Sequence, residues 1–343
     1  MKSIFRPFIL LLLLVAGSSL ADGATVTPSK KYVTRKVTSG AFDAVRTNTS
    51  LDIIYTVGPR DINIYAPDNL MPYIQVTLKG SEIIVNYKEN MTIKSSHNSY
   101  VKISAPDVVR FTAGSAGDIK IKSDIRLKND KIELSALSAG DIEAMNIEAD
   151  EVNIRANSAG DIETGNIKGN YVSLIVNSAG DIETRNIAAT KDAKIITNSA
   201  GDISVTEVFA GAHINIFTNS AGDIEIGEVS APDVSVGSNS SGNIEIKTIK
   251  STNVAATVNS AGDIRLSGIC STASFVSGSS GCIYARGLKA TNASATARGV
   301  GDIECHAFKS LSANRFGSGE IRYAGNPSNV IIQDKRKGGV SKF

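Results

Sequence analysis

Apolar and polar positions alternate along most of the chain, and the alternation returns with a fixed period. The central string is Ser-Ala-Gly-Asp-Ile, together with close variants of it. Its glycines follow one another at intervals of 18 to 23 residues: Gly117, Gly140, Gly160, Gly180, Gly201, Gly222, Gly242, Gly262, Gly281, Gly301 and Gly319. An internal repeat of this length is typical of a solenoid, in which each repeat is one structural unit stacked on the next.

Each repeat carries three apolar segments. The motif isoleucine is followed five residues later by a second apolar residue, as with Ile162 and Ile167. The same pairing runs on into the C-terminal repeats, with Ile264 and Ile269, and Ile303 and Phe308. About ten residues after the motif isoleucine comes an alternating run such as Val172-x-Leu174-x-Val176. Alternation and branched side chains predict strands, whereas no segment sustains the i, i+3, i+4 spacing of a helix.

Three short strands in a repeat of about 20 residues predict an all-β protein, a single-stranded parallel β-helix in which each repeat forms one coil. The motif isoleucines then stack in an interior ladder. Coils of variable length, without a six-residue internal period, favour a right-handed solenoid. In the turn, the motif glycine supplies a residue able to adopt φ > 0, and the aspartate can bond its local backbone. Stacked turns also predict an asparagine ladder, made by Asn157, Asn177, Asn198, Asn219, Asn239 and Asn259.

The first 21 residues have the pattern of a secretory signal peptide. They combine a charged start, a leucine-rich run over 8–16 and a small-residue cleavage site that ends at Ala21. The apolar run is short for a bilayer span, and no second long apolar segment follows. We therefore expect export to the periplasm, the outer-membrane surface or the extracellular medium. No integral membrane segment is expected after cleavage.

The remainder divides by pattern. Residues 22–36 are expected to form an N-terminal linker, and 37–110 an N-terminal cap with the first irregular coils. Such a cap is needed because an open solenoid end exposes unpaired strand edges. The regular Gly-Asp-Ile repeat fills 111–326, and 327–343 is expected to be a short, basic, mobile tail.

The charge balance and the cysteine content limit the kinds of partner and bond that the sequence predicts. The chain has 36 basic and 34 acidic residues, without the gathered basic excess of a nucleic-acid-binding protein. The three cysteines (Cys270, Cys282 and Cys305) allow one disulfide and one free thiol, and the pairing is left open. No C-x-x-C spacing indicates a metal site.

Several segments together resemble a known bacterial family. They are Ser-Gly-Ala-Phe-Asp-Ala-Val at 39–45, Leu-Asp-Ile-Ile-Tyr at 51–55, the Ala-Pro-Asp segment that begins at 66, the Gly-Asp-Ile repeats, and the closing segment at 319–327. Over about residues 37–335 the chain is similar to the head domain of putative auto-transporter adhesins, the GIN domain. This resemblance implies a pectin-lyase-like β-helix without catalytic residues and a role in adhesion.

The most distinctive candidate site is a set of acidic residues in the repeated Asp-Ile-Glu segment. In Asp-Ile-Glu the isoleucine points inward, so both carboxylates point outward and stack from coil to coil. The candidate residues are Asp141, Glu143, Asp161, Glu163, Asp181 and Glu183. Unit charges at the strand spacing repel by about 1 kcal/mol in water and more near a protein surface. Two explanations are open: the aspartates accept backbone N–H bonds in the turns, which is favoured, or Ca²⁺ bridges the columns through carboxylate oxygens. No other cofactor is expected.

The function that follows is an exported, non-catalytic surface or adhesion-type protein, a rigid solenoid that binds a surface glycan or protein. The alternative is a polysaccharide lyase or hydrolase, since β-helices host such enzymes. Lyases and hydrolases need a local cluster of acidic or basic groups, whereas the carboxylates here are spread evenly. His97, His213 and His306 share no repeat position. The enzyme alternative therefore rests on analogy of fold.

Overall fold

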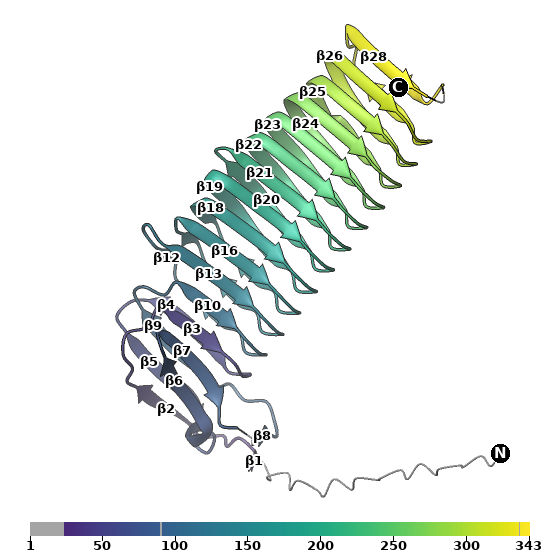
Figure 1. Cartoon of the computed structure of the whole chain (residues 1–343). Coiled ribbons are helices and arrows are strands. Elements are labelled where there is room, and N and C mark those ends of the chain that lie inside the picture. The colour runs from purple at the N-terminus through teal and green to yellow at the C-terminus, as the bar shows by residue number, and fades with distance from the viewer. Residues whose placement is uncertain (1–23, 90, 336) are drawn as a thin grey trace, which may run out of the picture.

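The computed structural model describes residues 24–343 except 90 and 336, so the predicted signal peptide lies outside the described residues. The chain forms a parallel β-solenoid of about 12 turns with about 20 residues per turn, drawn as one long stack in Figure 1. Its only helical element in the described part is a 3-10 turn, η1 (Met71–Tyr73). The predicted all-β parallel solenoid is confirmed, while its right-handed sense stays a prediction.

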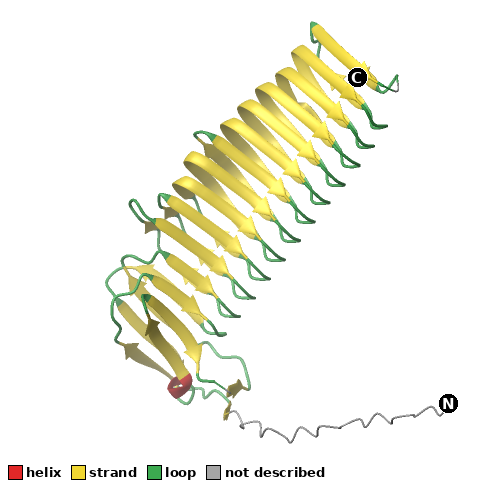
Figure 2. Cartoon of the chain, viewed as in Figure 1, coloured by secondary structure: helices red, strands yellow, loops and turns green. Residues whose placement is uncertain are grey.

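The N-terminal end is closed by a mixed sheet. Parallel pairs β3–β7 and β4–β9 start the solenoid, and the antiparallel pairs β2–β5, β5–β9 and β6–β7 cover it. Figure 2 shows these strands packed around the first coil. The strands are β1 (Ala24–Val26), β2 (Tyr32–Val37), β3 (Ala44–Thr47), β4 (Asp52–Val57), β5 (Asp61–Pro67), β6 (Ile74–Lys79), β7 (Glu82–Tyr87), β8 (Met91–Ile93) and β9 (Tyr100–Ala105).

The segment expected to be a linker, 22–36, contributes to this cap. Strand β2 pairs along its whole length with β5, from Tyr32 opposite Pro67 to Val37 opposite Ile62. Tyr32 stacks on Tyr65 with ring centroids 5.0 Å apart. Through these contacts β2 forms an edge strand of the cap, so the cap begins before residue 37.

The first regular coils contain three strands each, as predicted. The coil after Gly140, for example, has β14, β15 and β16. The strands of this part are β10 (Arg110–Ala113), β11 (Ile119–Ile121), β12 (Ile125–Arg126), β13 (Lys131–Ala136), β14 (Ile142–Ala144), β15 (Ile147–Glu148), β16 (Glu151–Ala156) and β17 (Ile162–Thr164).

In later coils the ladder continues around the bends, so one strand runs through most of a coil. These strands are β18 (Ile167–Val176), β19 (Ile182–Thr197), β20 (Ile203–Ala210), β21 (His213–Thr218), β22 (Ile224–Ser238), β23 (Ile244–Val258), β24 (Ile264–Ser277), β25 (Ile283–Ala297), β26 (Ile303–Arg315), β27 (Ile321–Ala324), β28 (Asn329–Asp334) and β29 (Val340–Lys342). Each coil is hydrogen-bonded in parallel to the next.

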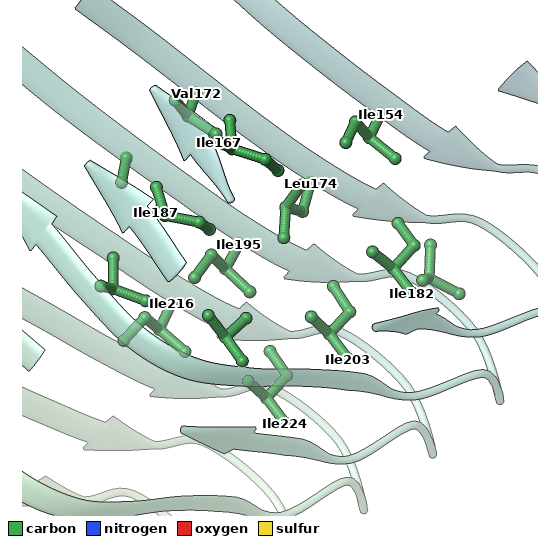
Figure 3. Packing of buried hydrophobic residues seen from close by; sticks show 14 of the residues in the cluster. Ile154, Ile167, Val172, Leu174, Ile182, Ile187, Ile195, Ile203, Ile216 and Ile224 are labelled. Atoms are coloured by element: carbon green, nitrogen blue, oxygen red, sulfur yellow. The ribbon is translucent and has the colours of Figure 1, made fainter. Parts of the chain in front are cut away.

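The motif isoleucines form the predicted interior ladder. Ile182 is the register partner of both Ile162 and Ile203, and each of the three is 1% exposed. Figure 3 shows Ile182, Ile203 and Ile224 stacked along the axis beside the second ladder, Ile167 and Ile187. Packing of like on like at the strand spacing gives one continuous core.

The motif glycines are required for a reason other than the one expected. Positive φ occurs at Gly80, Gly268, Gly325 and Gly338, and none of these is a motif glycine. Instead, a Cβ on Gly222 would lie 2.2 Å from the carbonyl oxygen of Gly201 in the preceding coil. The turns stack so closely that no side chain fits between them, and close approach of backbones is a second property that selects glycine.

Two expected core residues point outward. Ile269 is 57% exposed and Phe308 is 52% exposed. The spacing from Gly262 to Gly281 is one residue shorter than a 20-residue coil, and Gly268 takes the register position of Ile249. A one-residue shift moves a side chain to the other face of a strand, so the five-residue rule fails in the shortened coils.

Residues 327–343, expected to be a mobile tail, continue the solenoid. Strand β28 pairs with β26, and β29 pairs with β27. Arg315, at an interior position, forms a 3.1 Å ion pair with Asp334, and both side chains are over nine-tenths buried. Arg315 Nε also donates to the Gly319 carbonyl at 2.7 Å. This buried pair fixes the last coil.

Candidate functional site

The motif aspartates form one column of hydrogen bonds along the solenoid. Oδ1 of Asp141 accepts the backbone N–H of Asp161 at 2.8 Å, and Oδ1 of Asp161 accepts that of Asp181 at 2.8 Å. The same bond links every successive pair among Asp52, Asp118, Asp141, Asp161, Asp181, Asp202, Asp223, Asn243, Asp263, Cys282, Asp302 and Glu320. In each bond a backbone N–H donates to a side-chain acceptor, as in turn capping. Here, however, the donor and the acceptor lie in neighbouring coils.

The two breaks in the aspartate column keep this bond. Asn243 accepts the N–H of Asp263 through Oδ1 at 3.0 Å, and the sulfur of Cys282 accepts the N–H of Asp302 at 3.3 Å. The asparagine side chain offers an amide oxygen in place of the carboxylate oxygen, and the cysteine sulfur is a weak acceptor, so neither acceptor needs a full negative charge. The position therefore selects for an acceptor.

The motif glutamates form a second, outward column. Glu143, Glu163 and Glu183 are register partners on adjacent strands, and all three are exposed. Glu143 Oε1 lies 2.7 Å from Lys122 Nζ. A shallow depression of about 270 Å³ runs between the two columns from Asp118 to Glu163. The structure thus places all six predicted acidic residues on one lateral face.

Within residues 24–343, leaving aside 90 and 336, no group of three or more His, Cys, Asp or Glu residues is set to hold a metal ion. One oxygen of each of Asp141, Asp161 and Asp181 is engaged by the backbone. Calcium bridging of the columns stays a prediction.

The predicted asparagine ladder is confirmed. Nδ2 of each member donates to Oδ1 of the member in the preceding coil, at 2.7 or 2.8 Å, from Asn157 through Asn259. A second ladder escaped the sequence analysis: Asn146, Asn166 and Asn186 bond in the same way at another corner of the coil. Their 20-residue spacing was the signal, but they stand outside the Ser-Ala-Gly-Asp motif.

The histidines stand apart. His97 Nε2 lies 3.4 Å from the Tyr87 hydroxyl in the cap. His213 is exposed, with Nδ1 3.9 Å from Asp192. His306 packs on Phe308 near the C-terminal end, and burial together with the charge of Lys289 lowers its pKa. The structure brings no two of the three histidines together.

All three cysteines are free thiols. Burial raises the pKa of Cys270 to about 11 and that of Cys305 to about 12. A thiol held neutral in this way is a poor nucleophile and a poor metal ligand. The cysteines therefore serve packing and, at Cys282, the aspartate column.

A different lateral face is free of charge over four successive strands, β23 to β26. We call it the uncharged face. Its outward side chains are Asn253, Ala255, Thr257, Thr272, Ser274, Val276, Asn292, Ser294, Thr296, Ser310, Ser312 and Asn314. Charged side chains of the same coils lie on the other faces: Glu245, Lys247, Lys250, Arg265, Arg286, Lys289, Glu304 and Lys309.

The N-terminal end of the same sheet carries a charged depression, which we call the basic basin. Arg46 on β3, Arg110 on β10 and Lys79 in the β6–β7 hairpin surround Glu82, with Asn48, Ser81 and Ile84 completing the wall. The cavity measures about 480 Å³. Sequence analysis missed it, because its residues come from three separate segments outside the repeat.

Comparison with known proteins yields one family match. The model of the family described as "Putative auto-transporter adhesin, head GIN domain" matches residues 41–227 and 212–327. No curated protein matches the chain.

Several solved structures are similar to the chain. A putative adhesin from Bacteroides fragilis is 19% identical with a TM-score of 0.30, covering 92% of this chain and 95% of that one. A putative adhesin from Parabacteroides merdae is 19% identical with a TM-score of 0.29, covering 93% and 99%. A putative lipid binding protein from Parabacteroides distasonis is 17% identical with a TM-score of 0.31, covering 93% and 100%.

Proposed function

Because the chain belongs to the family of putative auto-transporter adhesins with a head GIN domain, we propose that it is an exported, non-catalytic adhesion-type protein. Its rigid solenoid binds a surface glycan or surface protein through a lateral face. The main support for this proposal is the distribution of charge in the last coils. Their charged side chains lie on other faces, so the uncharged face of β23–β26 carries only neutral outward side chains.

The uncharged face suits a flat, extended partner on physical grounds. Its serine, threonine and asparagine side chains are short, so little rotamer freedom is lost on contact. They offer hydroxyl and amide groups that both donate and accept hydrogen bonds. No charge has to be removed from water when the face is covered, which would be costly without a partner. A repetitive polymer meets the same chemistry in each coil.

Export rests on the sequence pattern of residues 1–21. Among the described residues no helix is long and apolar enough to cross a membrane. Cleavage after Ala21 gives a mature chain that begins Asp22-Gly23-Ala24. N-terminal sequencing of the protein recovered from the periplasm or medium tests this, and a retained Met1 on a membrane-bound product would contradict it.

Binding is tested with the purified mature chain on a glycan array and on bacterial and host cell surfaces. A variant that places charge on the uncharged face, Ser274→Glu with Ser294→Glu, is expected to lose binding by about tenfold or more. The matched control is Ser204→Glu with Thr206→Glu, which likewise adds two negative charges, at exposed positions on the side of the acidic face. Equal loss in both variants, or none in either, would contradict contact through the uncharged face.

The enzyme alternative is tested with the same preparation. Prolonged incubation with acidic and neutral polysaccharides is expected to produce no new reducing ends and no unsaturated sugar product. Turnover that survives further purification and is removed by a single carboxylate substitution would overturn the non-catalytic assignment.

A further inference from the structure

We propose that the basic basin binds the oxyanion, carboxylate or sulfate, of an acidic saccharide. The inference rests on the proposed adhesion function and names the chemical class that this part of the surface recognises. It is carried by four charged side chains that the fold assembles at one end of the lateral sheet: Arg46, Lys79, Glu82 and Arg110.

The two guanidinium groups converge on one carboxylate. Oε1 of Glu82 lies 3.3 Å from Nε of Arg46 and 3.9 Å from Nε of Arg110. The Glu82 side chain is only 18% exposed, whereas that of Arg110 is 44% exposed. Strand register explains the convergence: Ala44 lies between Glu82 and Arg110 on the intervening strand. Its short, buried side chain lets the two long ones meet across it.

Glu82 orients the arginines without neutralising the basin. Three cations against one carboxylate leave a net charge of +2 among the four groups. In the part of the chain that the structure describes, Glu82 is the only acidic side chain within ion-pair distance of Arg46 or Arg110, and none is that close to Lys79. Because Nε of each guanidinium faces Glu82, the terminal nitrogens are left for another acceptor. Two oxygens of a carboxylate or of a sulfate accept paired hydrogen bonds from such a fork.

The basin has the size and polarity for a sugar residue. Its volume is about 480 Å³, and Asn48 and Ser81 add neutral hydrogen-bonding groups beside Ile84. Two coils along the same sheet, Arg155 and Glu133 form a one-to-one ion pair at 3.0 Å. That pair has no excess charge, in contrast to the three cations and one carboxylate of the basin.

The basin and the uncharged face lie on the same lateral sheet, with the Glu133–Arg155 pair and Lys194 on the strands between them. Arg46 and Thr112 are register partners, and the same column of outward side chains reaches Thr257, Val276 and Thr296 further along the sheet. The column between them passes Arg155, Ile175 and Ile196, so the basin is a site separate from the uncharged face.

The test uses the mature chain with three probes: hyaluronan oligosaccharide, which carries carboxylates, heparin oligosaccharide, which adds sulfates, and neutral dextran oligosaccharide. Wild type is expected to bind at least one acidic probe and to bind it more weakly as salt rises. Lys79→Glu reverses a charge on the exposed hairpin without touching the core, and is expected to weaken that binding by about tenfold or more. The comparison between hyaluronan and heparin tells carboxylate from sulfate recognition.

The matched control is Lys194→Glu, an equal charge reversal at an exposed position of the same sheet. It is expected to leave acidic-probe binding within about twofold of wild type. Arg110→Ala tests the fork directly. Arg46→Ala is combined with Glu82→Gln so that no buried carboxylate is left without its cation. Melting temperatures of all variants identify any loss that comes from unfolding.

Absence of binding to both acidic probes, or equal weakening by Lys79→Glu and Lys194→Glu, would overturn the basin as a specific site. If wild type still binds cells or a neutral glycan in that case, the proposed adhesion function stands and only the acidic ligand is rejected. If acidic probes bind through the basin but no cell surface or array glycan is bound, the adhesion function fails and the anion site remains.

Discussion

Oδ1 of Asp161 accepts the backbone N–H of Asp181 at 2.8 Å, although the two residues are 20 positions apart in the chain. Each motif aspartate is thus an acceptor for the next coil and a donor to the previous one. The bond needs an acceptor atom at this position and does not need a negative charge, as Asn243 demonstrates.

Loss of the acceptor atom should therefore lower the free energy of unfolding more than loss of the charge alone. Asp181→Asn keeps Oδ1 for the N–H of Asp202, which lies 2.7 Å away, and is expected to cost less than about 1 kcal/mol. Asp181→Ala leaves that N–H without its partner and is expected to cost about 1–2 kcal/mol. Urea unfolding of both variants beside Glu183→Gln, the outward neighbour, measures the difference. Equal costs for asparagine and alanine would contradict the acceptor role.

An ionised side chain in the interior ladder should be far more costly. Ile182→Asp places a carboxylate between Ile162 and Ile203, where each wild-type side chain is 1% exposed. We expect a loss of about 3 kcal/mol or more in the free energy of unfolding, because the carboxylate would lie among buried apolar side chains. Circular dichroism during urea unfolding provides the measurement. Glu183→Asp, one residue away and outward, is the control and should unfold at nearly the wild-type midpoint.

Motif glycines should tolerate no side chain at all. Gly222→Ala would bring Cβ to 2.2 Å from the Gly201 carbonyl oxygen, and we expect destabilisation by about 2 kcal/mol or more. Gly80, in the β6–β7 hairpin, has φ of +64° but nothing within 4 Å of an added Cβ. Gly80→Ala carries only the conformational cost of about 1 kcal/mol. The reverse order of melting temperatures would show that backbone conformation, not close approach, selects the motif glycine.

Alkaline pH should lower the stability of the fold, because buried groups keep their protons in the folded chain and lose them in the unfolded chain. Burial raises the pKa of Cys305 from 9.0 to about 12, and burial raises that of Tyr55 from 10.0 to about 12. Between the two values the unfolded chain loses these protons while the folded chain keeps them, so stability is full below pH 9 and falls as pH rises towards 12. Urea midpoints at pH 7, 9 and 10 are expected to decline. The decline should be shallower in Cys305→Ala, and parallel curves would contradict this assignment.

Calcium should have little effect if the aspartates act through their backbone bonds. We expect the same melting temperature in millimolar CaCl₂ as in EDTA, since the folded state gains no ligand. A rise that disappears when Asp161, Asp181, Glu163 and Glu183 are replaced by asparagine and glutamine would instead establish Ca²⁺ bridging of the two columns.

The regular coils were predictable because their determinants are local and repeated. A motif isoleucine needs only its own alternation to be placed inside, and stacking follows from the constant period. The position of Gly268 could not be predicted from local alternation and a constant period. Its coil is one residue short, and the sequence alone does not say where the missing residue is taken up, so Ile269 was expected inside and lies outside.

The two ends were harder to predict because their contacts are not repeated. Arg315 and Asp334 form their buried pair across adjacent coils, and a basic tail sequence gives no sign of it. The basic basin depends on Ala44, which lets Arg110 and Glu82 meet across an intervening strand. Such a relationship follows from register, which propensity and pattern do not provide outside the repeat.

The hydrogen-bond ladders allow the solenoid to lose or gain whole coils, and its length changes accordingly. Because every ladder bond links residues one coil apart, deleting 161–180 would bring Asp141 and Asp181 into the relation that Asp141 and Asp161 now have. Loss or duplication of one unit changes the reach by about 4.8 Å and disturbs only one junction. The separation between the basin and the far end of the solenoid can therefore change in small steps during evolution, one coil at a time.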